Sequence, residues 1–252
     1  MASPFKDARL RIRWAKESLC HFERSARLYY KRAPYGRVVD PDPDGIHERH
    51  KLKFYKPFPV SLTKNTIRTV ENLRSALDLM AVAIAKLLKL PTDDPAFPFS
   101  KTASDFKGRI NRCCKGFPKE ITRLWEGYEP FGRTDNLLFA LNELCNTSKH
   151  RIIVPVGSKA GISIPLIETI GGTRPLTIFE GLWDTTENEI TYAITERGLK
   201  WKHHVQIAVG IFFGDVGEIA GREVEPNLRA MIASVTTIVD ETEAECQRLG
   251  LF

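Results

Sequence analysis

The stretch NTIRTVENLRSALDLMAVAIAKLLKL, which runs from Asn65 to Leu90, decides the fold of the N-terminal part of the chain. Apolar side chains recur in it every three or four residues: Ile67, Val70, Leu73, Leu77, Ala81, Ile84 and Leu88. This spacing places them on one face of an α-helix. Pro57 and Pro59 precede the stretch, and Ser61 or Thr63 can cap its first turn. The sequence therefore predicts a long helix with one buried face.

A second amphipathic helix is predicted within residues 5–32. Its apolar arc comprises Ala8, Ile12, Ala15, Leu19, Phe22, Ala26 and Tyr29. Its opposite arc is basic and comprises Arg9, Arg13, Lys16, Arg24, Arg27 and Lys31. Between the two helices, the turn PDPDG (41–45) separates residues 36–40 from residues 46–55, which predicts a β-hairpin. Alternation along residues 46–55 makes one face of this hairpin strongly basic.

The predicted secondary structure changes from helical to β-rich near residue 152. Shorter helices are predicted near residues 104–114 and 118–126, and another runs from Thr134 or Asp135 to about His150. The β-rich segments that follow are residues 152–156, 162–166, 176–182, 190–195 and 205–213. Pro226 then opens a last amphipathic helix. The fold class is therefore α+β: an N-terminal helical bundle with a β-hairpin insertion (1–156), followed by an antiparallel β-sheet and a C-terminal helix (157–252), which we expect to pack on the bundle.

Composition excludes several classes of protein. The longest apolar candidate, Met80–Leu90, is interrupted by Lys86 and Lys89, so no run reaches the roughly 18–20 residues of a membrane span. The N-terminal residues contain no apolar export signal. Five scattered cysteines without CxxC spacing favour reduced thiols. We therefore expect a cytoplasmic protein with no membrane contact, and no motif calls for a metal or another cofactor.

Charge is distributed unevenly along the chain. Residues 1–156 hold 29 Lys and Arg against 17 Asp and Glu, a net charge of +12, whereas residues 157–252 hold 8 against 14, a net charge of −6. A local basic surface attracts polyanions. The basic arc of the first helix is therefore a candidate site for RNA phosphates, and the alternative is an ordinary solvated helix face.

Polar residues on two predicted helices form a candidate site. Arg74 and Asp78 are four residues apart, beside the inward row of their helix. The helix that ends near His150 carries a polar row at helical spacing, comprising Asn142, Asn146 and Lys149. Antiparallel packing of the two helices would bring both sets together. In a catalytic site, His150 would be the general acid or base, Asn146 would orient it, and Arg74 or Lys149 would stabilise negative charge on phosphate.

A structural interpretation of the same residues is also open. Lys149, His150 and Arg151 stand where a helix ends, and cations there interact favourably with the helix dipole. Arg74 and Asp78 would then be a structural ion pair. Under this interpretation the protein is a non-catalytic binding or scaffold protein.

Four blocks of sequence resemble those of a widespread group of bacterial proteins in the same order: NLRSALD (72–78), FPF (97–99), EPF (129–131) and NTSKHR (146–151). The helix that ends Asn-x-x-x-His is also similar to the signature helix of the HEPN superfamily, whose motif is an arginine, a polar residue, three further residues and a histidine. Asn146 matches the polar position and His150 the histidine, whereas Cys145 stands at the position of the arginine.

The resemblance to HEPN proteins implies a helical bundle that dimerises and cleaves RNA without a metal, in a bacterial defence or toxin system. It implies His150 and Asn146 as catalytic residues, and Arg74 or Arg151 would supply the cation of the arginine that Cys145 replaces. Lys149, Arg151, Asp78 and Asn142 would then contact the substrate, while the basic arc of the first helix binds the rest of the RNA.

Overall fold

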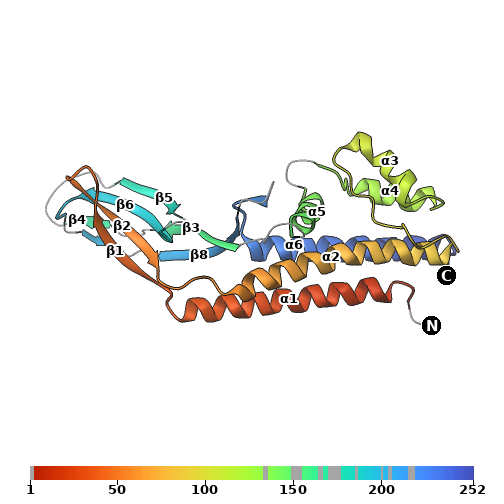
Figure 1. The fold of residues 1–252 in the computed structure, drawn as a ribbon, viewed down its shortest axis with the longest axis horizontal. Coiled ribbons are helices and arrows are strands. Elements are labelled where there is room, and N and C mark those ends of the chain that lie inside the picture. The colour runs from red at the N-terminus through yellow and green to blue at the C-terminus, as the bar shows by residue number, and fades with distance from the viewer. Residues whose placement is uncertain are drawn as a thin grey trace.

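The computed structural model describes residues 3–132, 136–148, 155–163, 167–169, 177–184, 187–199, 201–203, 206–214 and 219–252. Three long helices run along the molecule: α1 (Lys6–Lys31), α2 (Val60–Leu87) and α6 (Val224–Arg248). Figure 1 shows the β-strands at one end of these helices, and α3 (Ala103–Cys113) and α4 (Lys119–Gly127) beside the other end. The short α5 (Leu137–Ser148) lies between, against α2 and α6.

The strands join the two halves of the chain in one sheet. Its four antiparallel strands have the order β1-β2-β6-β5. They are β1 (Tyr35–Pro41), β2 (His47–Phe54), β6 (Glu189–Glu196) and β5 (Thr177–Asp184). Two further antiparallel pairs are β3 (Pro155–Ser163) with β8 (Gln206–Phe213), and β4 (Ile167–Thr169) with β7 (Trp201–His203). The structure therefore confirms the α+β class, and the pairing of β2 with β6 makes the hairpin part of the C-terminal sheet.

The main core lies between the long helices, as the apolar periodicity predicts. Leu73, Leu77 and Ile84 of α2 are fully buried. Trp125 of α4 is also fully buried, and its indole Nε1 donates a hydrogen bond to Thr242 Oγ1 of α6 at 2.9 Å. This bond satisfies the one polar atom of the buried indole ring. Within the described ranges, no helix is both long enough and apolar enough to cross a lipid bilayer.

Two of the long helices begin earlier than the sequence predicts. α2 begins at Val60 rather than Asn65, and α6 begins at Val224, ahead of Pro226. Leu62 and Val224 are both fully buried. Packing against the bundle therefore extends α2 by five residues, more than one turn, and α6 by two, which the periodicity of the later residues does not reveal.

Other boundaries differ because of local hydrogen bonding. Asn136 opens α5, since its Oδ1 accepts the backbone N–H groups of Leu138 and Phe139 at 2.9 and 3.0 Å. The expected caps, Thr134 and Asp135, lie outside the described residues. A single strand, β3, covers residues 155–163, where the sequence predicts two segments. It stays one strand because it pairs with β8 across an irregularity between Gly157 and Ala160.

The basic face predicted for the hairpin is neutralised in the folded protein. Lys51 Nζ lies 2.5 Å from Glu189 of β6 and 3.1 Å from Asp40 of β1. Arg49 Nε lies 2.5 Å from Asp42. Antiparallel pairing places these acidic residues beside the cations of β2, so the charges that alternate along this strand are largely cancelled.

Burial of His50 makes the stability of the sheet depend on pH. His50 is 6% exposed, its Nε2 lies 2.9 Å from Thr195 Oγ1, and burial lowers its pKa. Below a pH of about 6.5 the unfolded chain binds a proton at this site more readily than the folded protein, so stability falls as the pH falls. We expect His50→Gln to reduce the loss of melting temperature between pH 7.5 and pH 5.5.

His47→Gln is the matched control on the same strand. Its hydrogen bond with Asp44 raises the pKa of His47, so this histidine stabilises the fold at low pH and its contribution is lost as the pH rises. His47→Gln should therefore steepen the loss on acidification. An unchanged pH dependence in His50→Gln would contradict the assignment.

Candidate nucleic-acid interface

Arg74 and Asp78 form the centre of a polar cluster on α2. Their side chains form an ion pair, and Arg74 Nε donates to Asn142 Oδ1 of α5 at 3.3 Å. Arg74 Cζ also lies 4.5 Å from the centre of the Phe99 ring, within the range of a cation–π interaction. Asp78 Oδ1 accepts the backbone N–H of Phe97 at 3.0 Å. The pair therefore ties α2 to α5 and to the FPF block.

The EPF block follows α3 and α4 in the sequence, and in the fold it joins the same cluster. Ser100 N donates to Pro130 O at 3.1 Å, and Ser100 and Phe131 form a parallel β-bridge. The Phe97 ring lies 5.0 Å from that of Phe99 and 5.2 Å from that of Trp125. The blocks NLRSALD, FPF and EPF thus meet in one place, where they hold helices and loops together.

The structure brings together part of the expected catalytic site. Arg74 meets Asp78 and Asn142, as expected for packed helices, but its side chain is only 16% exposed. Asn146 is exposed on α5 and makes no hydrogen bond with Arg74 in the described part of the chain. The other residues expected there, Lys149, His150 and Arg151, lie outside the described residues. Arg74 is therefore occupied by structural contacts.

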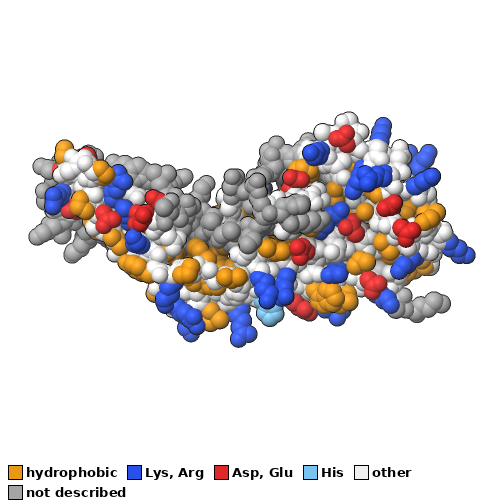
Figure 2. All heavy atoms as spheres, in the orientation of Figure 1, with side chains coloured by type: hydrophobic (Ala, Val, Ile, Leu, Met, Phe, Trp, Pro, Cys, Tyr) orange, Lys and Arg blue, Asp and Glu red, His pale blue; other side chains and the backbone are white. Residues whose placement is uncertain are grey.

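The basic arc of α1 remains open to solvent. Arg13, Lys16, Arg24, Arg27 and Lys31 are all exposed, and none forms an ion pair with another described residue; these five define the cationic face. In Figure 2, blue side chains project along the edge of the molecule that α1 forms in Figure 1. The face therefore offers uncompensated positive charge along the helix.

Arg9, which the sequence places in the same arc, behaves differently. Its guanidinium lies 2.6 Å from Asp240 and also pairs with Glu243, both on α6. The hydrogen bond to Glu243 raises the pKa of Arg9, so the side chain stays charged but compensated. Arg9 therefore fastens α1 to α6 instead of extending the cationic face.

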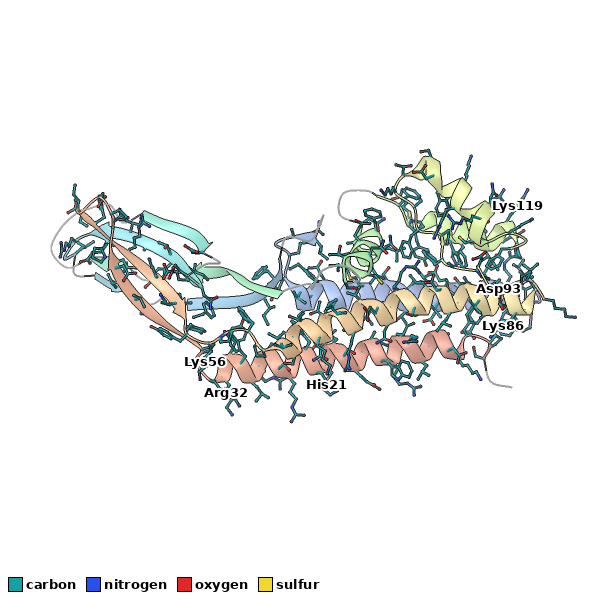
Figure 3. The ribbon with its side chains drawn as sticks, in the orientation of Figure 1. His21, Arg32, Lys56, Lys86, Asp93 and Lys119 are labelled. Carbon is teal, nitrogen blue, oxygen red and sulfur yellow. The ribbon has the colours of Figure 1, made fainter. Side chains whose placement is uncertain are left out.

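A groove between α1 and α2 contains residues that the charge pattern alone does not single out. It has a volume of about 420 Å³, and Trp14, 40% exposed, lines it together with Arg11, His21 and Arg68. Arg11 Cζ lies 5.1 Å from the Trp14 ring centre. Figure 3 shows His21 on the same outer side of the molecule as Arg32 at the end of α1. A tryptophan on the polar arc of an amphipathic helix is the sequence signal for this groove.

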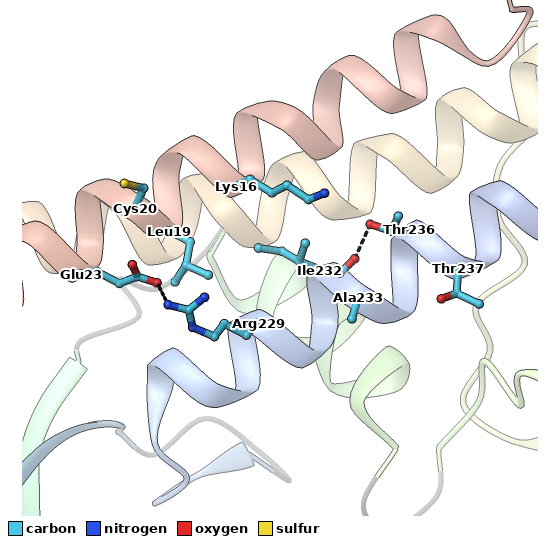
Figure 4. A pocket seen from close by; sticks show the side chains of 9 residues that line it. All are labelled: Lys16, Leu19, Cys20, Glu23, Arg229, Ile232, Ala233, Thr236 and Thr237. Carbon is cyan, nitrogen blue, oxygen red and sulfur yellow. Dashed lines mark hydrogen bonds and ion pairs between the residues drawn. The ribbon is translucent and has the colours of Figure 1, made fainter.

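A second groove, of about 620 Å³, separates α1 from α6 (Figure 4). Its apolar lining includes Leu19 and Ile232. Arg229 lies 2.5 Å from Glu23 and is therefore compensated, whereas Lys16 belongs to the cationic face. This groove adds apolar surface beside that face and no further unpaired cation among the described residues.

No protein family, curated protein or solved structure matches this chain in the comparisons made. Within the part of the chain that the structure describes, no three His, Cys, Asp or Glu side chains gather as the ligands of a metal ion would.

Arg74→Ala should destabilise the protein strongly. It removes the ion pair to Asp78, the hydrogen bond to Asn142 and the contact with Phe99, and we expect a loss of roughly 2–3 kcal/mol in the free energy of unfolding. Lys64→Ala, at an exposed position of the same helix, should change it by less than about 0.5 kcal/mol. Urea denaturation measures both. Equal stability of Arg74→Ala and wild type would show that the cluster is not structural.

Proposed function

We propose that this protein binds RNA through the cationic face of α1. The supporting observation is the set of five exposed cations that no described acidic residue neutralises. From Arg13 to Lys31 the face extends over about 27 Å at the rise of an α-helix. A strip of this length suits several successive phosphates of one strand.

The contrast with other cations of the protein supports this choice. Arg49 and Lys51 of the hairpin and Arg9 of α1 are held by carboxylates. Cations paired in this way have little charge left for a ligand, whereas unpaired ones bind phosphate and release the counterions that surround it. The cationic face therefore keeps charge that can attract a nucleic acid.

The groove beside this face supports RNA with unpaired bases as the ligand. Single-stranded bases stack on exposed aromatic rings, and Arg11 holds the Trp14 ring from one side while leaving it 40% exposed. His21 and Arg68 line the same groove and can donate hydrogen bonds to the adjoining phosphates, while Glu17 and Glu71 of the lining would face away from them or towards the base. Phosphates would then follow α1 while one base enters the groove.

Strand cleavage is not part of this proposal. The guanidinium expected to stabilise the reacting phosphate belongs to Arg74, which is held by Asp78, Asn142 and Phe99. A group that anchors two elements and is mostly buried is poorly placed to receive a substrate. The polar cluster therefore supports a binding protein, as the non-catalytic interpretation of the sequence predicts.

Replacing four cations of the face should weaken RNA binding and its dependence on salt. We expect the combined variant Arg13→Ala, Arg24→Ala, Arg27→Ala and Lys31→Ala to lower the slope of log affinity against log salt by up to about 3, because each phosphate contact with a single strand contributes about 0.7. Fluorescence anisotropy with a labelled single-stranded RNA, at several salt concentrations, measures this slope.

A control variant of equal charge change separates the face from net charge. Lys107, Lys115, Lys119 and Arg123 are exposed on or beside α3 and α4, and their replacement by alanine should leave most of the slope intact. Equal losses in both variants would contradict a specific face.

The RNA should remain intact in the presence of a chelator. Cleavage that disappears in His150→Ala would contradict the restriction to binding.

Trp14→Ala should weaken binding without changing the salt slope. Loss of one stacked base costs roughly tenfold in affinity, equal to about 1.4 kcal/mol. Trp14→Tyr keeps an aromatic ring at the same place and should retain most of the affinity. The same anisotropy titration measures both variants. If both bind RNA as wild type does, no base enters the groove beside α1.

A further inference from the structure

Two adjacent cysteines at the end of α3 form a close pair of thiols. Cys113 is the last residue of the helix and Cys114 follows it, and their Sγ atoms lie 3.7 Å apart. The Cys113 thiol also donates to the Arg109 carbonyl at 3.0 Å, and the Cys114 thiol lies 3.6 Å from the carbonyl oxygen of Ala96. A disulfide needs the sulfurs about 2.05 Å apart, so the two side chains and the backbone between them would have to move for the bond to form.

Only one of the two thiols reaches a surface groove. Both residues are buried, Cys113 at 7% and Cys114 at 3% exposure, but only Cys113 is part of the lining of a groove of about 450 Å³ between the loop that follows α2 and the end of α3. The groove is also lined by two basic and two acidic residues, Arg112, Lys115, Asp93 and Asp94. A small molecule with both positive and negative charges would therefore meet Cys113 first.

The surroundings also make the two sulfurs chemically different. A hydrogen bond from Cys114 lowers the pKa of Cys113, and the positive charge of Arg109 acts in the same direction. The pKa of Cys114 is raised, because this thiol keeps its proton in the hydrogen bond and is buried. Arg109 Nε is buried and has no hydrogen-bond partner among the described residues, so no acceptor at that atom offsets its positive charge. Cys113 thus has the features of a reactive thiolate.

We propose that Cys113 and Cys114 form a dithiol site that reacts with small peptide disulfides of mixed charge, such as oxidised glutathione. The Cys113 thiolate attacks one sulfur of the disulfide, which forms a mixed disulfide and releases one thiolate of the peptide. Cys114 gives its proton to water and attacks Cys113 Sγ, which releases the second peptide thiolate. Two cysteine thiols are oxidised to one disulfide, and the peptide disulfide is reduced to two thiols.

The product would be strained and therefore readily reversed. Neighbouring Cα atoms are 3.8 Å apart, closer than the 4.4–6.8 Å usual for a disulfide. Strained disulfides are reduced easily. Oxidation would also withdraw Cys114 from the Ala96 carbonyl, next to the Phe97 N–H that Asp78 holds. The site is thus suited to reversible modification that loosens this loop.

Intact mass spectrometry after incubation with oxidised glutathione tests the proposal. Cys20→Ser serves as the parent protein, because Cys20 is exposed and would form an adduct of its own. The parent should lose two hydrogen atoms in mass and keep no adduct. Adding Cys114→Ser should trap one glutathione on the protein, and adding Cys113→Ser instead should abolish the reaction. A Cys114→Ser protein that takes up no glutathione, or a Cys113→Ser protein that reacts as fast as the parent, would overturn the proposal.

A trivalent arsenical gives a second measurement that needs no redox step. Phenylarsine oxide bridges two neighbouring thiols with loss of one water. The parent should therefore bind one equivalent, and the variants that carry Cys113→Ser or Cys114→Ser should bind none. Circular dichroism of each variant verifies that it is folded. Dithiothreitol should restore the oxidised parent to its starting mass. A parent protein that binds no arsenical would exclude a usable dithiol.

Discussion

The Asp78 carboxylate is the contact on which the helical half of the molecule depends. It holds the Arg74 guanidinium and the backbone N–H of Phe97 at the same time. Through Arg74 it orients the Phe99 ring and Asn142, so one carboxylate fixes the position of α5 and of the loop after α2. The same loop places Phe97 against Trp125, whose hydrogen bond to Thr242 joins α4 to α6.

Pairing of charges decides which basic residues are available to a ligand. One face of β2 is strongly basic in sequence, like the outer arc of α1, yet its cations face carboxylates once β2 lies between β1 and β6. On α1, the arc opposite the core faces solvent, and α6 reaches only its edge, where it holds Arg9. The position of a helix in the bundle thus separates structural cations from those of the cationic face.

The dithiol and the polar cluster share one loop. Cys114 contacts the carbonyl of Ala96, and the next residue, Phe97, gives its N–H to Asp78. The FPF block, one of the four blocks that resemble bacterial sequences, therefore lies at a junction where α2, α3 and this loop meet. Chemistry at the thiols would act on this junction, at a distance along the fold from the cationic face of α1.

The sequence by itself determined the α+β class, the three long helices and the solvent-facing basic arc of α1, because hydrophobic periodicity is a local property of each segment. It also paired Arg74 with Asp78 and predicted that they meet the polar row of α5, since buried charges need partners, but it was the structure that placed Asn142 of that row against Arg74. Only the tertiary structure decided that Arg74 serves the fold, that Arg9 and the hairpin cations are neutralised, and that Trp14 borders a groove. These outcomes depend on carboxylates and rings from elements far apart in the chain, and no local pattern records which of them come into contact.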